Sequence, residues 1–210
     1  RLIDERRAAP GEQIIDGLIN AHDGEELLSL PELIASCVLL LFAGHETTAH
    51  FFSNGLRSLI LHPAQMEKLR QHGDDASFVS NAGEEMLRWD GPAISTVRVL
   101  AEDVDWASSN GVVAMKKGQR VFAFKGPANP HPAMFPEPQN LDLTLENTRR
   151  QISFGHGVHM CLGATLARVE GQIGFPKLLN RMRDISIADP APEWLDTLLT
   201  RGGKNPHIKA

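Results

Sequence analysis

The sequence has only two cysteines among its 210 residues and no excess of positive charge, because its formal net charge is −5. Two cysteines cannot build a disulfide framework, and Cys37 lies in an apolar run, which favours a reducing compartment. The acidic balance argues against nucleic acid as the main partner. Cys37 itself is expected in the core.

Long apolar runs are also scarce. The longest, from Leu33 to Gly44, contains Ser36 and falls short of the roughly 20 residues that cross a bilayer. No signal peptide opens the chain. We therefore expect a cytoplasmic protein that has no membrane partner, and we expect the apolar run to be a buried helix segment.

What is present is typical of a globular chain. Apolar residues make up 42% of the sequence and charged residues 22%, which is ordinary for a folded domain. A chain of 210 residues corresponds to one domain, or to a large part of a bigger one, and can bury a substantial core. No internal repeat or low-complexity segment interrupts it.

Apolar periodicity predicts helices in the first half. Residues 12–21 carry apolar side chains at helical spacing. Ser29, Pro31 and Glu32 form a helix start signal with a capping-box pair, and the following pattern extends to Leu61. Such a helix is about 46 Å long at 1.5 Å per residue. Because it would cross a whole domain, its middle is expected to be buried.

The remaining segments predict a mainly α fold with small β-sheets. Further helices are expected from Pro63 to Gln71, from residue 76 to Trp89, and from Leu162 to Met182, where Pro176 favours a kink. Short strands are expected at 97–101, 103–106, 112–114 and 120–124, with turns at 110–111 and 117–118. Residues 127–138 are proline-dense and irregular, and a strand-like tail closes the chain.

The most informative segment is the glycine-rich run from Phe154 to Gly163, which places Cys161 directly before a predicted helix. The unpaired N–H groups at a helix N-terminus hold a sulfur as an anion. Glycines permit unusual backbone conformations and leave room for a flat ligand. A heme whose iron takes the sulfur of Cys161 as axial ligand would fit this loop.

Two other interpretations of this loop are open. Cys161 could be a buried, inert cysteine beside a glycine turn. His156, His159 and Cys161 could also be zinc ligands, although zinc usually takes four ligands and no second Cys/His cluster accompanies them.

The pattern F-x-x-G-x-x-x-C-x-G, formed by Phe154, Gly157, Cys161 and Gly163, resembles the heme-thiolate signature of the cytochrome P-450 family. The resemblance implies that heme b is the cofactor and that Cys161 is the iron ligand. It also implies a set of residues that contact the heme: Phe154, Gly155, Gly157, His159 and Gly163 in the loop, and Ala43, Gly44 and Arg98 elsewhere. Arg98 and His159 would bind the two heme carboxylates.

The long helix carries a polar run, Ala43 to Thr48, at its midpoint. A threonine hydroxyl there can bond the carbonyl one turn back and locally open the helix. By itself the run is more typical of a solvated helix face with incidental Glu and Thr. It resembles the oxygen-binding segment of the P-450 distal helix, which implies that Thr47 positions dioxygen and that Glu46 helps to deliver protons.

Glu85 and Arg88 stand at i and i+3 on a predicted helix, where opposite charges meet. This E-x-x-R pair resembles the core pair of the same family, in which a third polar residue completes the network. Here that position corresponds to Asn140, which can form a hydrogen bond but adds no charge. We therefore do not expect a three-member ion network.

The order of these motifs resembles the bacterial, soluble branch of the family over nearly the whole chain. The expected fold is its C-terminal heme-binding half: distal helix, E-x-x-R helix, short strands, meander, cysteine loop and proximal helix. Residues 1–210 would form a single partial domain that lacks the N-terminal half. That half, or a second chain, would cover the distal helix.

The implied function is a monooxygenase that inserts one oxygen atom of O2 into a small apolar organic substrate. Electrons would come from a ferredoxin or flavodoxin that docks at Arg149, Arg150 and Arg168. The candidate substrate contacts are Leu39, Phe42, Ile94, Leu198 and Leu199. A heme-binding fragment without turnover is the alternative, and an α-rich fragment without heme is a third.

Overall fold

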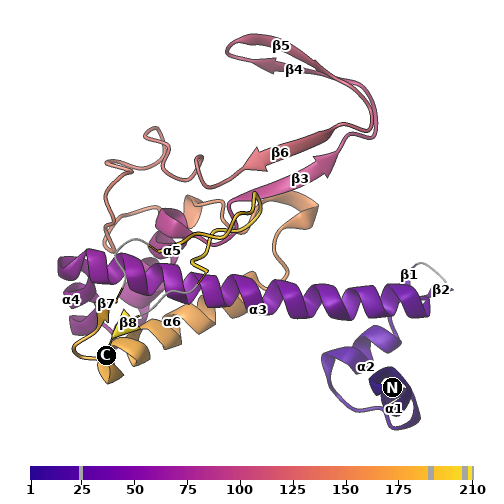
Figure 1. The fold of residues 1–210 in the computed structure, drawn as a ribbon, viewed down its shortest axis with the longest axis horizontal. Coiled ribbons are helices and arrows are strands. Elements are labelled where there is room, and N and C mark those ends of the chain that lie inside the picture. The colour runs from indigo at the N-terminus through magenta and orange to yellow at the C-terminus, as the bar shows by residue number, and fades with distance from the viewer. Residues whose placement is uncertain (24–25, 189–191, 205–207, 210) are drawn as a thin grey trace. The chain divides into compact units, whose positions relative to one another are not determined.

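The computed structural model describes residues 1–23, 26–188, 192–204 and 208–209 (Figure 1). The chain divides into two compact units, residues 1–47 and residues 48–210. Helix α3 (Leu30–Leu61) contributes its first part to one unit and its last part to the other. The predicted class, mainly helical with small antiparallel sheets, is confirmed.

The first unit contains two short helices, α1 (Leu2–Ala8) and α2 (Ile14–Ile19), and a pair of two-residue strands, β1 (His22–Asp23) and β2 (Glu26–Leu27). Helix α2 lies within the segment where helical spacing predicted it. Its first turn is closed by Asp16, a buried carboxylate that accepts a hydrogen bond from the Gln13 N–H at 2.9 Å. This contact satisfies one of the free N–H groups at the helix start.

Both ends of α3 lie where the sequence predicts them. At the start, the Glu32 carboxylate accepts hydrogen bonds from the Ser29 N–H at 2.8 Å and from the Ser29 hydroxyl at 2.6 Å. At the other end the helix stops at Leu61, two residues before Pro63, because a proline disfavours helical conformation in the residue before it. The next helix, α4 (Pro63–Gln71), then begins with that proline.

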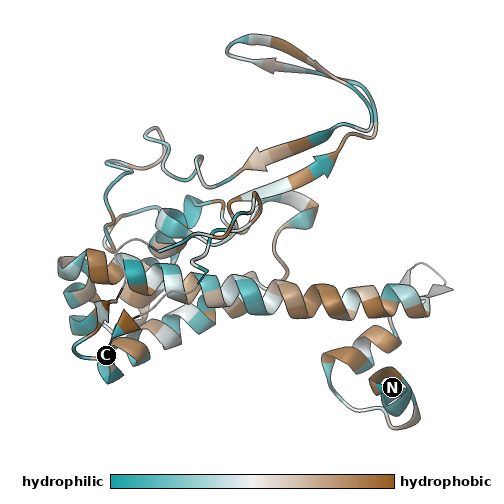
Figure 2. Cartoon of the chain, in the orientation of Figure 1, coloured by the Kyte–Doolittle hydropathy of each residue, from teal (hydrophilic) through white to brown (hydrophobic). Residues whose placement is uncertain are grey.

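The expected burial of the apolar part of α3 is wrong for the described chain. Leu33 is buried and Cys37 is half-buried, but Val38, Leu39 and Phe42 are exposed. In Figure 2 this part of α3 is largely brown, the colour of hydrophobic residues. Among the described residues, no element covers these side chains, and the helices of the same unit, α1 and α2, have only 7 and 6 residues.

By length and composition alone, α3 is a candidate membrane span. One such helix is weak evidence, because the central helix of a domain core passes the same test. An apolar surface of this kind is rarely left in contact with water and usually marks an interface.

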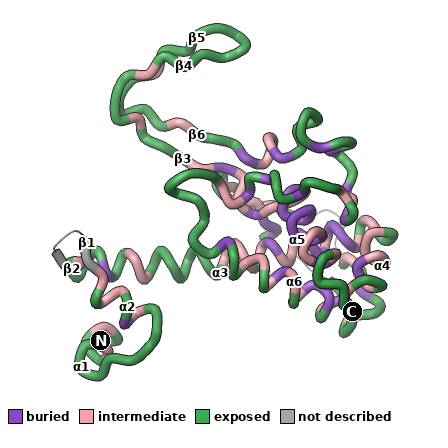
Figure 3. The backbone as a smooth tube through the Cα atoms, turned by 180° about the vertical axis from the view of Figure 1, so that it is seen from behind, coloured by how far each residue is buried: buried purple, intermediate pink, exposed green. Residues whose placement is uncertain are grey.

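The second unit has the core of the protein. Helix α5 (Ala76–Asp90) and helix α6 (Ala164–Arg181) pack with α4 and the end of α3, and buried residues gather there (Figure 3). The core is formed mainly by apolar side chains of these helices and of the irregular segment after β6: Phe51, Leu56, Leu59, Leu69, Val79, Ala82, Met86, Leu87, Leu141, Leu143, Phe175, Leu179 and Ile185.

Helices α3 and α6 approach each other closely through aromatic rings and glycines. The rings of Phe51 and Phe175 meet edge to face, with 5.2 Å between their centroids. A Cβ atom on Gly55 would lie 2.5 Å from Cζ of Phe175, and one on Gly171 would lie 2.7 Å from Cε1 of Phe51. The two glycines therefore provide the space that these rings occupy.

The predicted strands are confirmed, with shifts of one or two residues at their ends. Strand β3 (Ser95–Val99) pairs antiparallel with β6 (Arg120–Phe124), and β4 (Val104–Ser108) pairs with β5 (Gly111–Met115) as a hairpin. The predicted turns carry glycines with positive φ, 109° at Gly111 and 83° at Gly118. In the tail, β7 (Ser186–Ile187) pairs with β8 (Ile208–Lys209).

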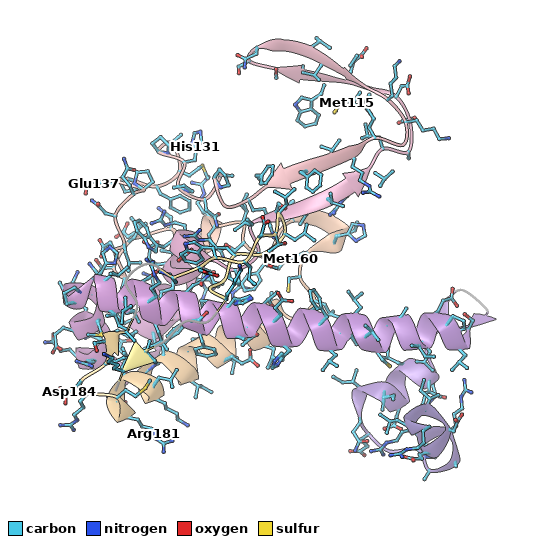
Figure 4. The ribbon with its side chains drawn as sticks, viewed as in Figure 1. Met115, His131, Glu137, Met160, Arg181 and Asp184 are labelled. Atoms are coloured by element: carbon cyan, nitrogen blue, oxygen red, sulfur yellow. The ribbon has the colours of Figure 1, made fainter. Side chains whose placement is uncertain are left out.

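Residues 125–147, between β6 and the short 3-10 helix η1 (Thr148–Arg150), have no regular structure, as their prolines predict. Figure 4 labels His131 and Glu137 on this meander. Helix α6 then begins at Ala164, two residues later than predicted, and continues through the buried Pro176 to Arg181.

The glycine at the α3–α6 crossing gives a stability test. We expect Gly55→Ala to lower the free energy of unfolding by about 1–3 kcal/mol, because the added methyl group displaces the fully packed Phe175 ring. Urea unfolding followed by far-UV circular dichroism measures this change. Gly83→Ala in α5 is the matched control: no described atom lies within 4 Å of its added Cβ, so helix propensity predicts equal or slightly higher stability. Equal effects of the two substitutions would contradict the packing argument.

Candidate functional site

The cysteine loop is a closed turn that ends at the start of α6. Gly155 and Gly157 adopt left-handed conformations, with φ of 74° and 77°, which a residue with a side chain rarely adopts. A short 3-10 helix, η2 (Gly157–His159), follows. The Cys161 N–H then donates to the Phe154 carbonyl at 2.9 Å and closes the loop. Figure 4 labels Met160, the residue before the cysteine.

The sulfur of Cys161 is accessible. Cys161 is an exposed, free cysteine, so the interpretation as a buried, inert cysteine is wrong. Among the described residues, no group of three His, Cys, Asp or Glu side chains could hold a metal ion. The zinc interpretation, with His156 and His159 beside Cys161, therefore finds no support in the described part of the chain.

The surface around Cys161 has the chemistry that a flat apolar ligand requires. Apart from the glycine and its two neighbours in the chain, no described atom lies within 4 Å of a Cβ atom built on Gly155, Gly157 or Gly163. The side chains of Val158 and Leu162 are 97% and 89% exposed. A thiol between open glycines and uncovered apolar side chains fits heme, which needs one axial ligand and an apolar surface for its ring.

A cluster of buried polar side chains lies under this loop. The Lys125 ammonium donates to the Ser153 carbonyl at 2.8 Å, and the Asn129 amide donates to the Ser153 hydroxyl at 2.8 Å. The Gln151 side chain accepts from the Ser153 N–H at 2.6 Å and donates to the Glu84 carboxylate at 2.8 Å. All five residues are buried. The cluster fixes the backbone immediately before Phe154.

Arg168 of α6 extends this cluster. Its guanidinium forms an ion pair with Glu84 of α5 and lies over the ring of Phe154, 4.6 Å from the centroid. Arg168 is half-buried, and its guanidinium is engaged by Glu84 and Phe154. Arg149 and Arg150, by contrast, are exposed on η1. Of the three arginines expected to meet an electron donor, only these two are exposed.

Glu85 and Arg88, the predicted E-x-x-R pair, form a buried bidentate ion pair on α5. The Arg88 Nε and Nη2 atoms donate to the two Glu85 oxygens at 2.6 and 2.7 Å. Burial raises the pKa of Glu85 above the usual glutamate value, while Arg88 and the Asp142 N–H partly offset this effect. The pair is thus enclosed on all sides by protein.

Arg88 also binds the meander through main-chain oxygens. Nη1 donates to the Pro138 carbonyl at 2.9 Å and Nη2 donates to the Asn140 carbonyl at 3.2 Å. The side-chain amide of Asn140 instead donates to Glu137 at 2.9 Å. The third partner of the Glu85–Arg88 pair is therefore not a side chain but the backbone carbonyls of the meander. These hydrogen bonds join α5 to the meander without a further charged residue.

The polar run of α3 lies in the first unit up to Thr47, and Thr48 is the first residue of the second unit. The Thr47 hydroxyl donates to the Ala43 carbonyl one turn back at 2.6 Å, as the sequence analysis anticipates. The helix nevertheless continues without a break, so the expected local opening is absent at these residues. Ala43 and Gly44 are exposed, and Glu46 and Thr47 are half-buried. No atom of the described residues lies within 4 Å of a Cβ built on Gly44.

The remaining candidates are all on the surface or near it. Arg98 on β3 is exposed and donates to the Val97 carbonyl at 2.8 Å, and His159 is exposed in the cysteine loop. Leu39 and Phe42 are exposed on α3. Within the described part of the chain, neither basic side chain forms an ion pair with a carboxylate.

The second unit brings Ile94 and the tail residues together. The Ile94 N–H donates to the Leu199 carbonyl at 3.0 Å, and the Ser95 hydroxyl donates to the Leu198 carbonyl. The side chains of Leu198 and Leu199 are exposed. Residues 94–95 and 198–199, which are far apart in the sequence, thus lie side by side.

The site residues predicted from the sequence do not include Lys125, Asn129, Gln151, Ser153 or Glu84. A lysine that follows an apolar strand is expected at the surface, and nothing in the local pattern distinguishes this one. The adjacency of Ser153 to Phe154, the first residue of the signature, is the one signal that could have directed attention to this cluster.

Comparisons with known proteins agree with one another. A cytochrome P-450 family model matches residues 3–184. The biotin biosynthesis cytochrome P-450 of Bacillus subtilis (strain 168) is 38% identical over 188 residues, which cover 90% of this chain and 45% of that protein. The 6-deoxyerythronolide B hydroxylase of Saccharopolyspora erythraea is 35% identical over 204 residues, with 96% and 48% covered.

Solved structures give the same result. P450BioI in complex with an acyl carrier protein ligated to hexadec-9Z-enoic acid has a TM-score of 0.85 and 34% identity, covering 99% of this chain and 51% of that one. A myxobacterial cytochrome P-450 in complex with myristic acid has a TM-score of 0.87 and 38% identity, covering 99% and 50%. The chain spans about half the length of these relatives.

The buried ion pair gives a prediction for the second unit. We expect Arg88→Met to lower the free energy of unfolding by about 3–5 kcal/mol, because it leaves the Glu85 carboxylate buried without its partner. The urea midpoint of the variant measures the loss. Lys116→Met, which removes an exposed pair with Asp103, should leave the midpoint almost unchanged, since exposed ion pairs contribute little. A small effect of Arg88→Met would contradict the assignment of this pair as the link between α5 and the meander.

Proposed function

The chain belongs to the cytochrome P-450 family, and on this premise we propose that it is the heme-bearing half of a heme-thiolate monooxygenase. Members of this family bind heme b. Relatives are named as hydroxylases and monooxygenases. The observation that carries the proposal is the exposed sulfur of Cys161 at the end of a glycine loop and at the start of α6.

Cys161 and its neighbours would hold the cofactor. The thiolate of Cys161 would ligate the iron, and the open surfaces over Gly155, Gly157 and Gly163 would accept the ring. His159 and Arg98 would bind the heme carboxylates, since both carry donors and are exposed. Heme supplies an iron that activates dioxygen with electrons from a redox partner.

The polar run of α3 would handle protons. The Thr47 hydroxyl donates a hydrogen bond to the Ala43 carbonyl at 2.6 Å, so the lone pairs of its oxygen are left to accept another hydrogen bond. A hydroxyl whose hydrogen is already bonded to a carbonyl can still accept a hydrogen bond, and it can thereby orient a water molecule or another O–H group. The neighbouring Glu46 carboxyl can supply a proton through one water, as general acid catalysis requires.

We propose an apolar organic substrate. The candidate contacts are Leu39 and Phe42 on α3 in the first unit and, separately, Ile94, Leu198 and Leu199 in the second unit. Two structural neighbours hold the fatty acyl compounds named above, which supports this class. Exposed Arg149 and Arg150 would meet an acidic ferredoxin or flavodoxin in the cytoplasm.

We further propose that residues 1–210 act as one partial domain of a larger assembly. The exposed apolar surface of α3 and the half-length match to the relatives support this. The remaining half of the family fold, or a second chain, would cover α3 and complete the substrate pocket.

Heme ligation by Cys161 can be tested by spectroscopy. We expect the purified chain loaded with hemin, reduced and treated with carbon monoxide, to show the red-shifted Soret band of thiolate ligation. Cys161→Ala should abolish this band, whereas Cys37→Ala should keep it, because Cys37 lies within helix α3 and outside the glycine loop that precedes α6. A band that survives Cys161→Ala, or that never forms in the wild-type chain, would overturn the proposal.

The alternative is a heme-binding chain without turnover, which the exposed apolar surface of α3 favours, because the surface that would enclose a substrate is open. Hemin titration combined with reductase-driven oxidation of an apolar substrate separates the two functions. Tight binding and thiolate ligation together with no product would support the alternative, while product formation that depends on Thr47 would exclude it.

A further inference from the structure

Lys125 is a buried lysine at the end of strand β6, where its side chain is only 8% exposed. Lysine is almost never fully buried unless its charge has a partner. The backbone of Lys125 is fixed as well, since its N–H donates to the Ile94 carbonyl at 2.7 Å. A side chain held in this way has a defined position, so its ammonium group faces a defined set of neighbouring groups.

The position of Lys125 is tied to the cysteine loop by two consecutive hydrogen bonds. Its Nζ donates to the Ser153 carbonyl at 2.8 Å. The next residue, Phe154, accepts the Cys161 N–H through its own carbonyl at 2.9 Å. The ammonium therefore fixes the same short stretch of backbone that positions Cys161.

No carboxylate neutralises Lys125 in the described part of the chain, since none of the ion pairs found there includes it. Glu84, the carboxylate of the same buried cluster, is paired with Arg168. Burial lowers the pKa of Lys125 below the usual lysine value, and attraction to the sulfur of Cys161 partly offsets this. The hydrogen bonds through Ser153 and Phe154 bring the lysine and the cysteine to adjacent points of one backbone stretch, and Cys161 is the acidic group whose attraction acts on the lysine there.

We propose that Lys125 is a positioning residue for Cys161, which fixes the cysteine loop through Ser153 and places a buried positive charge within electrostatic reach of the sulfur. The fixing of the loop stands on the hydrogen bonds at Ser153 and Phe154, and the direction of the electrostatic effect agrees with the attraction between Lys125 and Cys161. The further claim that Lys125 influences the heme iron through Cys161 rests on the proposed function. A cation near the ligand withdraws electron density from sulfur and so favours reduced iron, because charge and hydrogen bonding around a ligand tune the metal.

The charge can be measured without heme by alkylating Cys161 in a Cys37→Ala background. Iodoacetate and iodoacetamide are similar in size, but only iodoacetate carries a negative charge. The rate constant for iodoacetate divided by that for iodoacetamide therefore reports the local electrostatic potential at the sulfur, and a nearby positive charge raises this ratio. We expect Lys125→Met to lower this ratio by about three- to tenfold, and Lys125→Arg to keep it within about twofold of the parent. Because Lys125 is buried, added salt should screen the effect only weakly.

Lys177→Met is the matched control, since Lys177 is an exposed lysine of α6 and its loss should leave the ratio unchanged. Circular dichroism of each variant shows whether it is folded, and Lys125→Arg keeps the test valid if Lys125→Met is unstable. The inference is overturned if the ratio is the same in the parent and in folded Lys125→Met, or if Lys177→Met lowers it equally.

The extension to iron is tested on the hemin-loaded chain. We expect Lys125→Met to shift the iron reduction potential to more negative values while the thiolate Soret band is retained. An unchanged potential in a variant with a lowered alkylation ratio would overturn the extension to iron. If the wild-type chain never forms the thiolate band, the proposed function fails, while a lowered alkylation ratio would still support the placement of Lys125 beside Cys161.

Discussion

The site depends above all on the hydrogen bonds that buried side chains make to the backbone in front of the cysteine loop. Ser153 is the centre of these contacts, because Lys125 binds its carbonyl and Asn129 binds its hydroxyl. Buried polar groups of this kind are costly unless every partner is present. The cluster therefore holds the loop in one conformation, and the position of Cys161 follows from it.

Helix α5 links this cluster to the rest of the second unit through two adjacent glutamates. Glu84 pairs with Arg168 of α6 near the cysteine loop, and Glu85 pairs with Arg88, which binds the meander. Neighbouring positions on a helix point about 100° apart. One turn of α5 can thus fix two different elements, and this arrangement explains why charged residues are found in the core.

Much of the fold follows from local sequence signals. The ends of α3, the whole of α4 and the pairing of β4 with β5 lie where capping residues, prolines and glycines predict them. The exposed apolar side of α3 was not predicted, because periodicity shows which side chains are apolar but not whether a partner covers them. For the site, the loop motif directed attention to Cys161, while the buried lysine under it gave no local signal.

The sequence by itself determined the chemistry of this protein: a cysteine between glycines at a helix start, a threonine one turn after Ala43, and an acid–base pair at i and i+3. These features act over a few residues, so their spacing is enough. Only the tertiary structure decided that Lys125 is buried under the cysteine loop and that backbone carbonyls complete the Arg88 network. Such contacts join segments that are far apart in the chain, and burial depends on packing that no local pattern records.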